Sequence, residues 1–129
     1  MALLDTTVLV DLARRPQIPT RQPARAAVQE LLAAGEMLCT SRINEAEFRV
    51  GPEMSQERER ELEGVEGVLA SIVILEFDGK AAQHFARIKA AMLKHGRPVG
   101  DCDTLIAAVA LANGQLLLTR NPLHFRQIP

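Results

Sequence analysis

Short apolar stretches that end at acidic or amide side chains alternate with helical patterns along this chain of 129 residues. Continuous apolar stretches are typical of parallel strands buried on both faces, and their alternation with helices predicts a parallel sheet covered on both sides. We expect strands at residues 2–5, 37–40, 71–77 and 115–119. The sequence therefore predicts an α/β fold: a three-layer α/β/α sandwich with a central parallel sheet of about four to five strands.

Helices are expected between these strands, because apolar residues recur there at helical spacing. The expected ranges are 6–14, 24–34, 55–70, 79–94 and 101–113. A further helix is expected to begin at Asn44, which stands three residues before Glu47 as in a capping box, and to end near Gly51 and Pro52. Three prolines predict a loop over residues 16–23. The β-branched, fully apolar run 72–75 predicts a buried parallel strand.

Composition sets the broad class. With 47% hydrophobic and 24% charged residues, the chain is typical of a globular protein, and its length predicts one domain over residues 1–129. The net charge of -1 does not mark a nucleic-acid binder, so any phosphate contact must come from a local basic patch. The apolar runs are too short to cross a bilayer, and Asp5 interrupts any signal-peptide core. We therefore expect a cytoplasmic protein with no membrane contact.

The polar residues at the strand ends are expected to meet at one edge of the sheet. A helix from Asp103 to residue 113 descends about 15 Å at 1.5 Å per residue, and the strand that follows climbs back roughly 17–20 Å. Asp103 and Asn121 should therefore reach the same level. Asp5 ends the first strand on that edge, and Glu47 lies in the helix after the second. Four separate segments thus direct side-chain oxygens toward one rim.

Electrostatics indicates what such a rim requires. Two carboxylates about 5 Å apart repel by roughly 3 kcal/mol at an effective dielectric constant of 20, so a cluster of them recruits a cation. Oxygen ligands without paired histidine or cysteine suit Mg²⁺ or Mn²⁺, and such an ion supports phosphodiester hydrolysis without a covalent intermediate. The alternative for each acid is a helix cap: Asp5, Asp101 and Asp103 would cap directly, and Glu47 would be the acid of a capping box.

Four blocks, taken in order, resemble PIN-domain proteins, in particular the VapC-like toxins of bacterial and archaeal toxin–antitoxin pairs. The blocks are residues 3–12, 43–51, 103–110 and 118–125. The resemblance implies a single compact PIN-like α/β/α nuclease domain that binds Mg²⁺ or Mn²⁺ and cuts RNA. It also implies a cognate antitoxin that covers the site, and a homodimer.

The resemblance carries roles to individual residues. Asp5, Glu47 and Asp103 would be the metal-binding and catalytic acids, and Thr119 would position one of them. Asp101 is a further metal candidate, although the block match places Asp103 directly before the apolar run. The chain departs from the family pattern at Asn121, where many members have a fourth acid, and at His124, where an acid often precedes the final phenylalanine. Both departures put a tightly bound second metal ion in doubt.

Three arginines near the rim, Arg42, Arg49 and Arg120, could grip RNA phosphates, or could simply be solvated. Two other functions remain open. Asn121 would suit a catalytically silent PIN-like module that binds RNA or a protein. A receiver-like domain phosphorylated on a strand-end aspartate expects a lysine after the last strand, where this chain has Arg120.

Overall fold

The four strands in the described part of the chain form one sheet. The computed structural model describes residues 1–13, 23–96, 100–120 and 122–125. The strands are β1 (Ala2–Leu4), β2 (Leu38–Ser41), β3 (Val73–Leu75) and β4 (Leu116–Leu118). They run parallel in the order β3-β2-β1-β4. Each predicted strand is therefore present, and β1 lies inside the sheet, where its three residues are fully buried.

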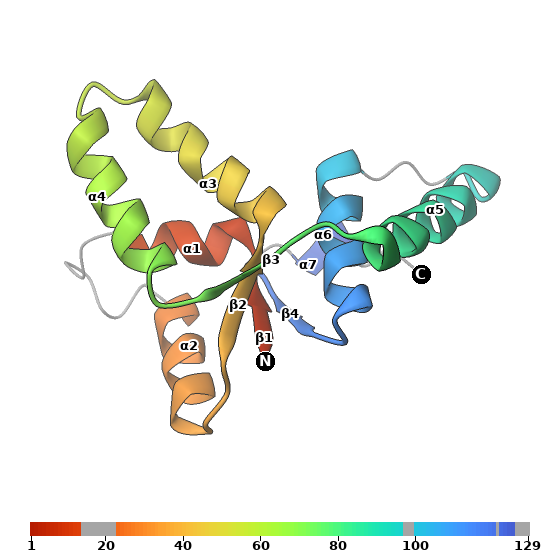
Figure 1. Cartoon of the computed structure of the whole chain (residues 1–129), viewed down its shortest axis with the longest axis horizontal. Helices are drawn as coiled ribbons and strands as arrows, with labels where there is room; N and C mark the ends of the chain where they lie inside the picture. Colours follow the sequence, from red (N-terminus) through yellow and green to blue (C-terminus); the bar gives the residue numbers. More distant parts are fainter. Residues whose placement is uncertain (14–22, 97–99, 121, 126–129) are drawn as a thin grey trace.

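Helices cover both faces of this sheet (Figure 1). One layer contains α1 (Thr6–Ala13), α2 (Pro23–Ala33), α3 (Arg42–Met54) and α4 (Arg58–Leu69). The other layer contains α5 (Gly79–Lys94), α6 (Asp101–Ala112) and the short α7 (Pro122–Phe125). The predicted three-layer α/β/α architecture is confirmed. Among the described helices, none is both long and apolar enough to cross a membrane.

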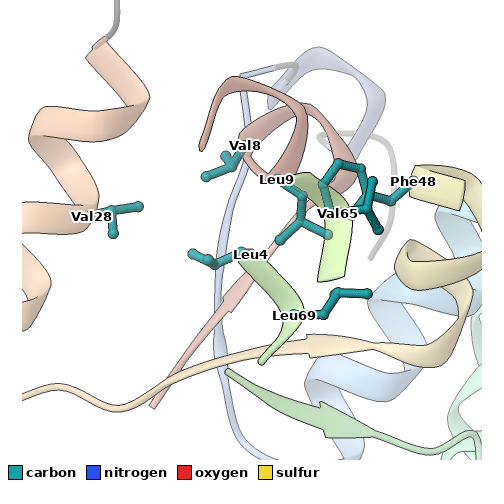
Figure 2. Close-up of a cluster of buried hydrophobic side chains, with 7 residues drawn as sticks. All are labelled: Leu4, Val8, Leu9, Val28, Phe48, Val65 and Leu69. Carbon is teal, nitrogen blue, oxygen red and sulfur yellow. The ribbon is translucent and has the colours of Figure 1, made fainter. Parts of the chain in front are cut away.

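Alternate residues of β1 supply the two halves of the core, because successive strand side chains point to opposite faces. Leu4 packs with residues of α1 to α4, and Figure 2 shows Val28 of α2 facing Leu4 and Val8 in this cluster. Leu3 packs instead with Cys39 and with residues of α5 and α6. Burial of both leucines on opposite sides fixes the depth of β1, and with it the level at which the chain leaves the sheet after Leu4.

The β-branched run is correctly predicted as a strand but wrongly predicted as a buried one. β3 lies at the edge of the sheet, and Val73 is 41% exposed. Edge and central parallel strands can share the same composition, because burial depends on which strands pair, and the local sequence does not encode that order.

The helix that carries Glu47 begins earlier and ends later than predicted. α3 starts at Arg42, and its capping box joins Ser41 to Asn44. Asn44 is therefore the third residue of the helix rather than its cap. The helix also continues through Pro52 to Met54. Ser41 is the signal that the prediction missed: it ends β2 and stands three residues before a side chain that can return its hydrogen bond.

The other helix boundaries agree with the predictions to within a few residues. α2 ends as expected before Gly35, whose φ of 79° is favourable for glycine. The predicted apolar face of α5 is buried at Ala81, Ile88 and Met92. The short α7 was not predicted. The expected proline-rich loop falls largely outside the described residues, and Pro23 begins α2.

Candidate active site

Three chain segments meet where the parallel strands end. Asp5 directly follows β1, Thr119 directly follows β4, and Glu47 lies in the second turn of α3, the helix that follows β2. The backbone N–H of Asp5 donates to the carbonyl of Leu118 at 2.9 Å, which holds the two strand ends side by side. This is the carboxyl edge of the sheet, where the sequence placed Asp5 and Glu47.

The carboxylate of Asp5 is buried, and the described residues that donate hydrogen bonds to it are all neutral. Its residue is 6% exposed. Asn44 Nδ2 donates to Oδ1 at 3.1 Å, and Thr119 Oγ1 and Thr7 Oγ1 donate to Oδ2 at 2.7 and 3.3 Å. No Lys, Arg or His among the described residues forms an ion pair with it. Since an unneutralised buried charge is costly, this environment favours a bound cation.

The carboxylate of Glu47 is joined to that of Asp5 through two uncharged side chains. Thr6 Oγ1 donates to Glu47 Oε1 at 2.6 Å. The same hydroxyl accepts a hydrogen bond from Asn44 Nδ2 at 3.0 Å. Asn44 therefore contacts Asp5 directly and Glu47 through Thr6. Neither Asn44 nor Thr6 was among the site residues predicted from the sequence, although Thr6 follows Asp5 in the chain.

The structure decides against the capping alternative for these two acids. The hydrogen bonds that the Asp5 carboxylate accepts from described residues come from side chains, whereas the backbone N–H groups of Val8 and Leu9 in α1 donate to its carbonyl oxygen. Glu47 is not the acid of the capping box, because that box consists of Ser41 and Asn44. Both carboxylates thus have surroundings that helix capping does not explain.

The two aspartates of α6 differ in their surroundings. Asp103 lies half-buried in the first turn of α6, a helix that packs against α3, β2 and β4. Asp101 is exposed, and its Oδ1 pairs with Lys89 Nζ at 2.9 Å. Neither is the N-cap residue, which is Gly100. Asp101 is thus exposed and Asp103 half-buried, and the metal role of each stays a prediction.

The third acid does not complete a preformed metal group in this conformation. Within the described parts of the chain, no three His, Cys, Asp or Glu side chains are grouped closely enough to hold a metal ion. Asn121, the predicted amide ligand, lies outside the described residues. The structure therefore brings Asp5, Glu47 and Thr119 together. The metal roles of Asp5, Glu47, Asp103, Asp101 and Asn121 all stay predictions.

The three predicted phosphate-binding arginines all have carboxylate partners. Arg42 pairs with Glu45 and Glu76, and Arg49 pairs with Glu45 and Glu66, as the salt bridges show. Arg120 has one such partner: its Nη1 lies 2.9 Å from Oδ1 of Asp11, a residue only 4% exposed on α1. Arg120 directly follows Thr119, which contacts Asp5, so Arg120 lies beside the site. Its role toward RNA stays a prediction, as do those of Arg42 and Arg49.

Comparison with known proteins agrees with this geometry. The PIN domain matches residues 2–129. The chain is 32% identical over 126 residues to the tRNA(fMet)-specific endonuclease VapC of Shigella flexneri, across 98% of this chain and 90% of that protein. It is 37% identical over 92 residues to the protein of the same name from Salmonella typhimurium, across 71% of this chain and 70% of that one.

Solved structures give the same result for the fold. DNA-bound VapBC from Salmonella typhimurium superposes with a TM-score of 0.82 at 30% identity, over 100% of this chain and 94% of that chain. VapBC2 from Rickettsia felis, bound to a DNA fragment from its promoter, has a TM-score of 0.86 at 23% identity, over 99% and 92% of the two chains, which speaks for the fold alone. By sequence and by fold, the chain belongs to the PIN-domain family and, within it, to the VapC ribonucleases.

Proposed function

We propose that this chain is a metal-dependent endoribonuclease, the toxin of a toxin–antitoxin pair, that hydrolyses RNA phosphodiester bonds. The observation that carries the proposal is the buried Asp5 carboxylate, whose donors within the described part of the chain are neutral and which is linked to Glu47 at the edge of the sheet. The curated relatives reported above are named as endonucleases specific for tRNA(fMet), which makes that RNA the first substrate to test.

The donor set fits Mg²⁺ or Mn²⁺. The described site offers carboxylate and hydroxyl oxygens, the ligand type that these ions prefer. A carboxylate has about four lone-pair positions, so the three hydrogen bonds to Asp5 leave it able to accept a further ligand. When bound, such an ion supplies a water of lowered pKa and stabilises charge on the phosphate.

Each side chain then has a distinct role. Asp5 would hold the ion directly, with Thr119 and Asn44 fixing the direction of its two oxygens. Glu47 would bind the ion through a water molecule or orient the attacking water. Asp103, which lies in the first turn of α6, would approach as a further oxygen ligand.

A cognate antitoxin is the proposed partner, because solved relatives are toxin–antitoxin complexes. The described residues offer a groove of about 750 Å³ between α1, α3 and α4 for such a partner. Apolar Val10, Phe48 and Val65 line it. Three glutamates and one arginine also line it: Glu57, Glu61, Glu63 and Arg60. An apolar groove with an acidic rim suits a basic amphipathic segment of the antitoxin. The proposed homodimer rests on the family resemblance alone.

Charge reversal in this groove tests the partner. Co-expression of the cognate antitoxin should restore growth of cells that produce the wild-type chain. The double variant Glu57→Lys and Glu61→Lys should stay toxic but escape this rescue, because its rim would repel a basic segment. Rescue as complete as that of the wild type would remove the groove from the proposal.

The second candidate, a catalytically silent PIN-like module, is not favoured, because the relatives are named as nucleases. Incubation of the purified protein with tRNA(fMet), with Mn²⁺ or with chelator, separates the two. We expect cleavage only with Mn²⁺, and a loss of more than about a hundredfold in Asp5→Asn, since even residues that only support a metal ligand contribute about 10–100-fold. Glu63→Gln, which removes an exposed charge on α4, is the control. No cleavage by the wild type, or undiminished cleavage by Asp5→Asn, would exclude the nuclease.

A further inference from the structure

Asn44 is a fully buried polar residue whose hydrogen bonds exceed what its helix requires. It is 0% exposed and is the third residue of α3. A buried amide is destabilising unless its oxygen and both of its N–H groups find partners. All of these groups have partners here. The partner of the amide oxygen is in the helix cap, and the partners of the NH₂ group are in the candidate active site.

The oxygen of Asn44 serves the helix cap. The hydroxyl of Ser41 donates to Oδ1 at 2.6 Å, and the backbone N–H of Ser41 faces the same atom at 3.4 Å. The backbone N–H of Asn44 in turn donates to Ser41 Oγ at 3.1 Å. A backbone N–H can only donate, so this side of the amide must be the oxygen. The NH₂ group therefore points the other way, toward the strand ends.

The NH₂ group serves the candidate active site. Its two hydrogens go to two acceptors, Asp5 Oδ1 at 3.1 Å and Thr6 Oγ1 at 3.0 Å. Because the Thr6 hydroxyl accepts from Asn44, its own hydrogen is free for Glu47 Oε1, at 2.6 Å. The NH₂ group of Asn44 thus reaches the carboxylate of Asp5 directly and that of Glu47 through the Thr6 hydroxyl. None of these bonds is needed to cap α3.

We propose that Asn44 is a positioning residue for the nuclease, an inference that rests on the proposed function. It keeps the carboxylates of Asp5 and Glu47, which come from different segments, at a fixed distance from each other. It also determines which oxygen of each carboxylate accepts a hydrogen bond. The remaining lone pairs of both carboxylates are then available to a single divalent ion. Asn44 itself contacts neither the ion nor the RNA.

Two variants separate this role from helix capping. Asn44→Ala removes the cap oxygen and both site bonds, whereas Ser41→Ala removes only capping bonds. Both should lower the melting temperature, because each disrupts the cap. We expect Asn44→Ala to weaken Mn²⁺ binding about 10–100-fold, the range for residues that support metal ligands, and Ser41→Ala to bind Mn²⁺ nearly as the wild type does. Calorimetric titration of the full chain with Mn²⁺, without RNA, measures this difference at a temperature where every variant is folded.

A second pair keeps the test decisive if Asn44→Ala does not fold. Thr6→Val keeps the shape of the side chain but cuts the link to Glu47, and Thr6→Ser keeps the hydroxyl. Thr6→Val should lose Mn²⁺ affinity and kcat, with a smaller effect on the KM for RNA, and Thr6→Ser should restore both. Equal Mn²⁺ affinity in Thr6→Val and Thr6→Ser, or in Asn44→Ala and Ser41→Ala, would overturn the positioning role while the wild type still cleaves RNA. A wild type that neither binds Mn²⁺ nor cleaves RNA would instead overturn the proposed function, and this inference with it.

Discussion

Asp5 and Glu45 are two buried carboxylates with opposite surroundings. Asp5 is 6% exposed, and its donors among the described residues are all neutral. The side chain of Glu45 is 12% exposed and is held between two guanidinium groups, those of Arg42 and Arg49. Within the described structure, one buried carboxylate therefore has cationic partners and the other has none.

The compensated carboxylate is part of a structural network. Arg42 links Glu45 to Glu76 after β3, and Arg49 links it to Glu66 on α4. Burial raises the pKa of Glu45, but the hydrogen bonds from Arg42 and Arg49 outweigh this, so its pKa lies below the ordinary value. The network thus joins β3, α3 and α4, and each of its three carboxylates contacts at least one guanidinium group. The carboxylate of Asp5 forms no ion pair with a described residue, and we attribute that difference to function.

The largest expected effect is on the response to metal. Mn²⁺ at about a hundred times its Kd should raise the free energy of unfolding of the wild type by about 2.7 kcal/mol. Asp5→Asn should lose this increment. Without metal it should be at least as stable as the wild type, because the amide keeps the shape and removes an unneutralised buried charge. Urea unfolding with Mn²⁺ and with chelator measures both. An unchanged increment in Asp5→Asn would show that the ion binds elsewhere.

Glu45→Gln should show the reverse behaviour. It removes the charge from two hydrogen bonds to arginine, and a hydrogen bond to a charged group contributes about 1.5–3 kcal/mol. We expect the free energy of unfolding to decrease by an amount within that range, while the increase caused by Mn²⁺ stays the same. Glu63→Gln on α4, an exposed glutamate, should change neither quantity and serves as the control. Loss of the Mn²⁺ increment in Glu45→Gln would mean that the two carboxylates do not have separate roles.

Parts of this contrast could be predicted from the sequence. Asp5 was placed at the carboxyl edge because it follows an apolar run, and the ends of parallel strands must lie together, whereas the role of Thr119 came only from the family resemblance. Asn44 was misread because Glu47 stands three residues after it, so that this pair has the same spacing as the true capping box of Ser41 and Asn44. Local spacing could not show which pair lies at the start of the helix.

The remaining differences depend on contacts between distant segments. The bond from Asn44 to Asp5 joins residues 39 positions apart, and that from Thr119 to Asp5 spans 114 positions. The ion pairs of Arg42 and Arg49 depend on where β3 ends and how α4 packs. Chemical type and spacing identified these arginines as candidates for phosphate binding, but only the folded structure shows which carboxylates they already contact.

The pH dependence of stability should also separate the two carboxylates. The pKa of Glu45 is lowered in the folded state from its ordinary value of 4.5. Its contribution to stability is therefore fully present above about pH 4.5 and is lost as the pH falls through the lowered folded value. The difference in the free energy of unfolding between the wild type and Glu45→Gln should shrink between pH 6 and pH 3, as measured by urea unfolding. A constant difference over this range would contradict the compensated state of Glu45.

The smallest expected effect concerns RNA binding, and it tests whether arginines that hold a carboxylate also bind phosphate. Arg42 and Arg49 each contact two carboxylates, whereas Arg120 contacts one and is 49% exposed. Arg120 can therefore reach a phosphate without giving up a shared network. We expect Arg120→Gln to raise the KM for RNA and to reduce the slope of log K against log salt by about 0.7, the value for one lost phosphate contact on a single strand.

Arg42→Gln and Arg49→Gln should leave that salt slope unchanged, because each arginine is engaged by Glu45 and by one exposed glutamate. Salt titrations of RNA binding, made with Asp5→Asn so that the RNA stays uncut, compare the three arginines under the same conditions. An equal reduction of the slope in all three variants would mean that Arg42 and Arg49 also bind RNA phosphates. The ion-pair network around Glu45 would then not be purely structural, and its separation from the active site would be wrong.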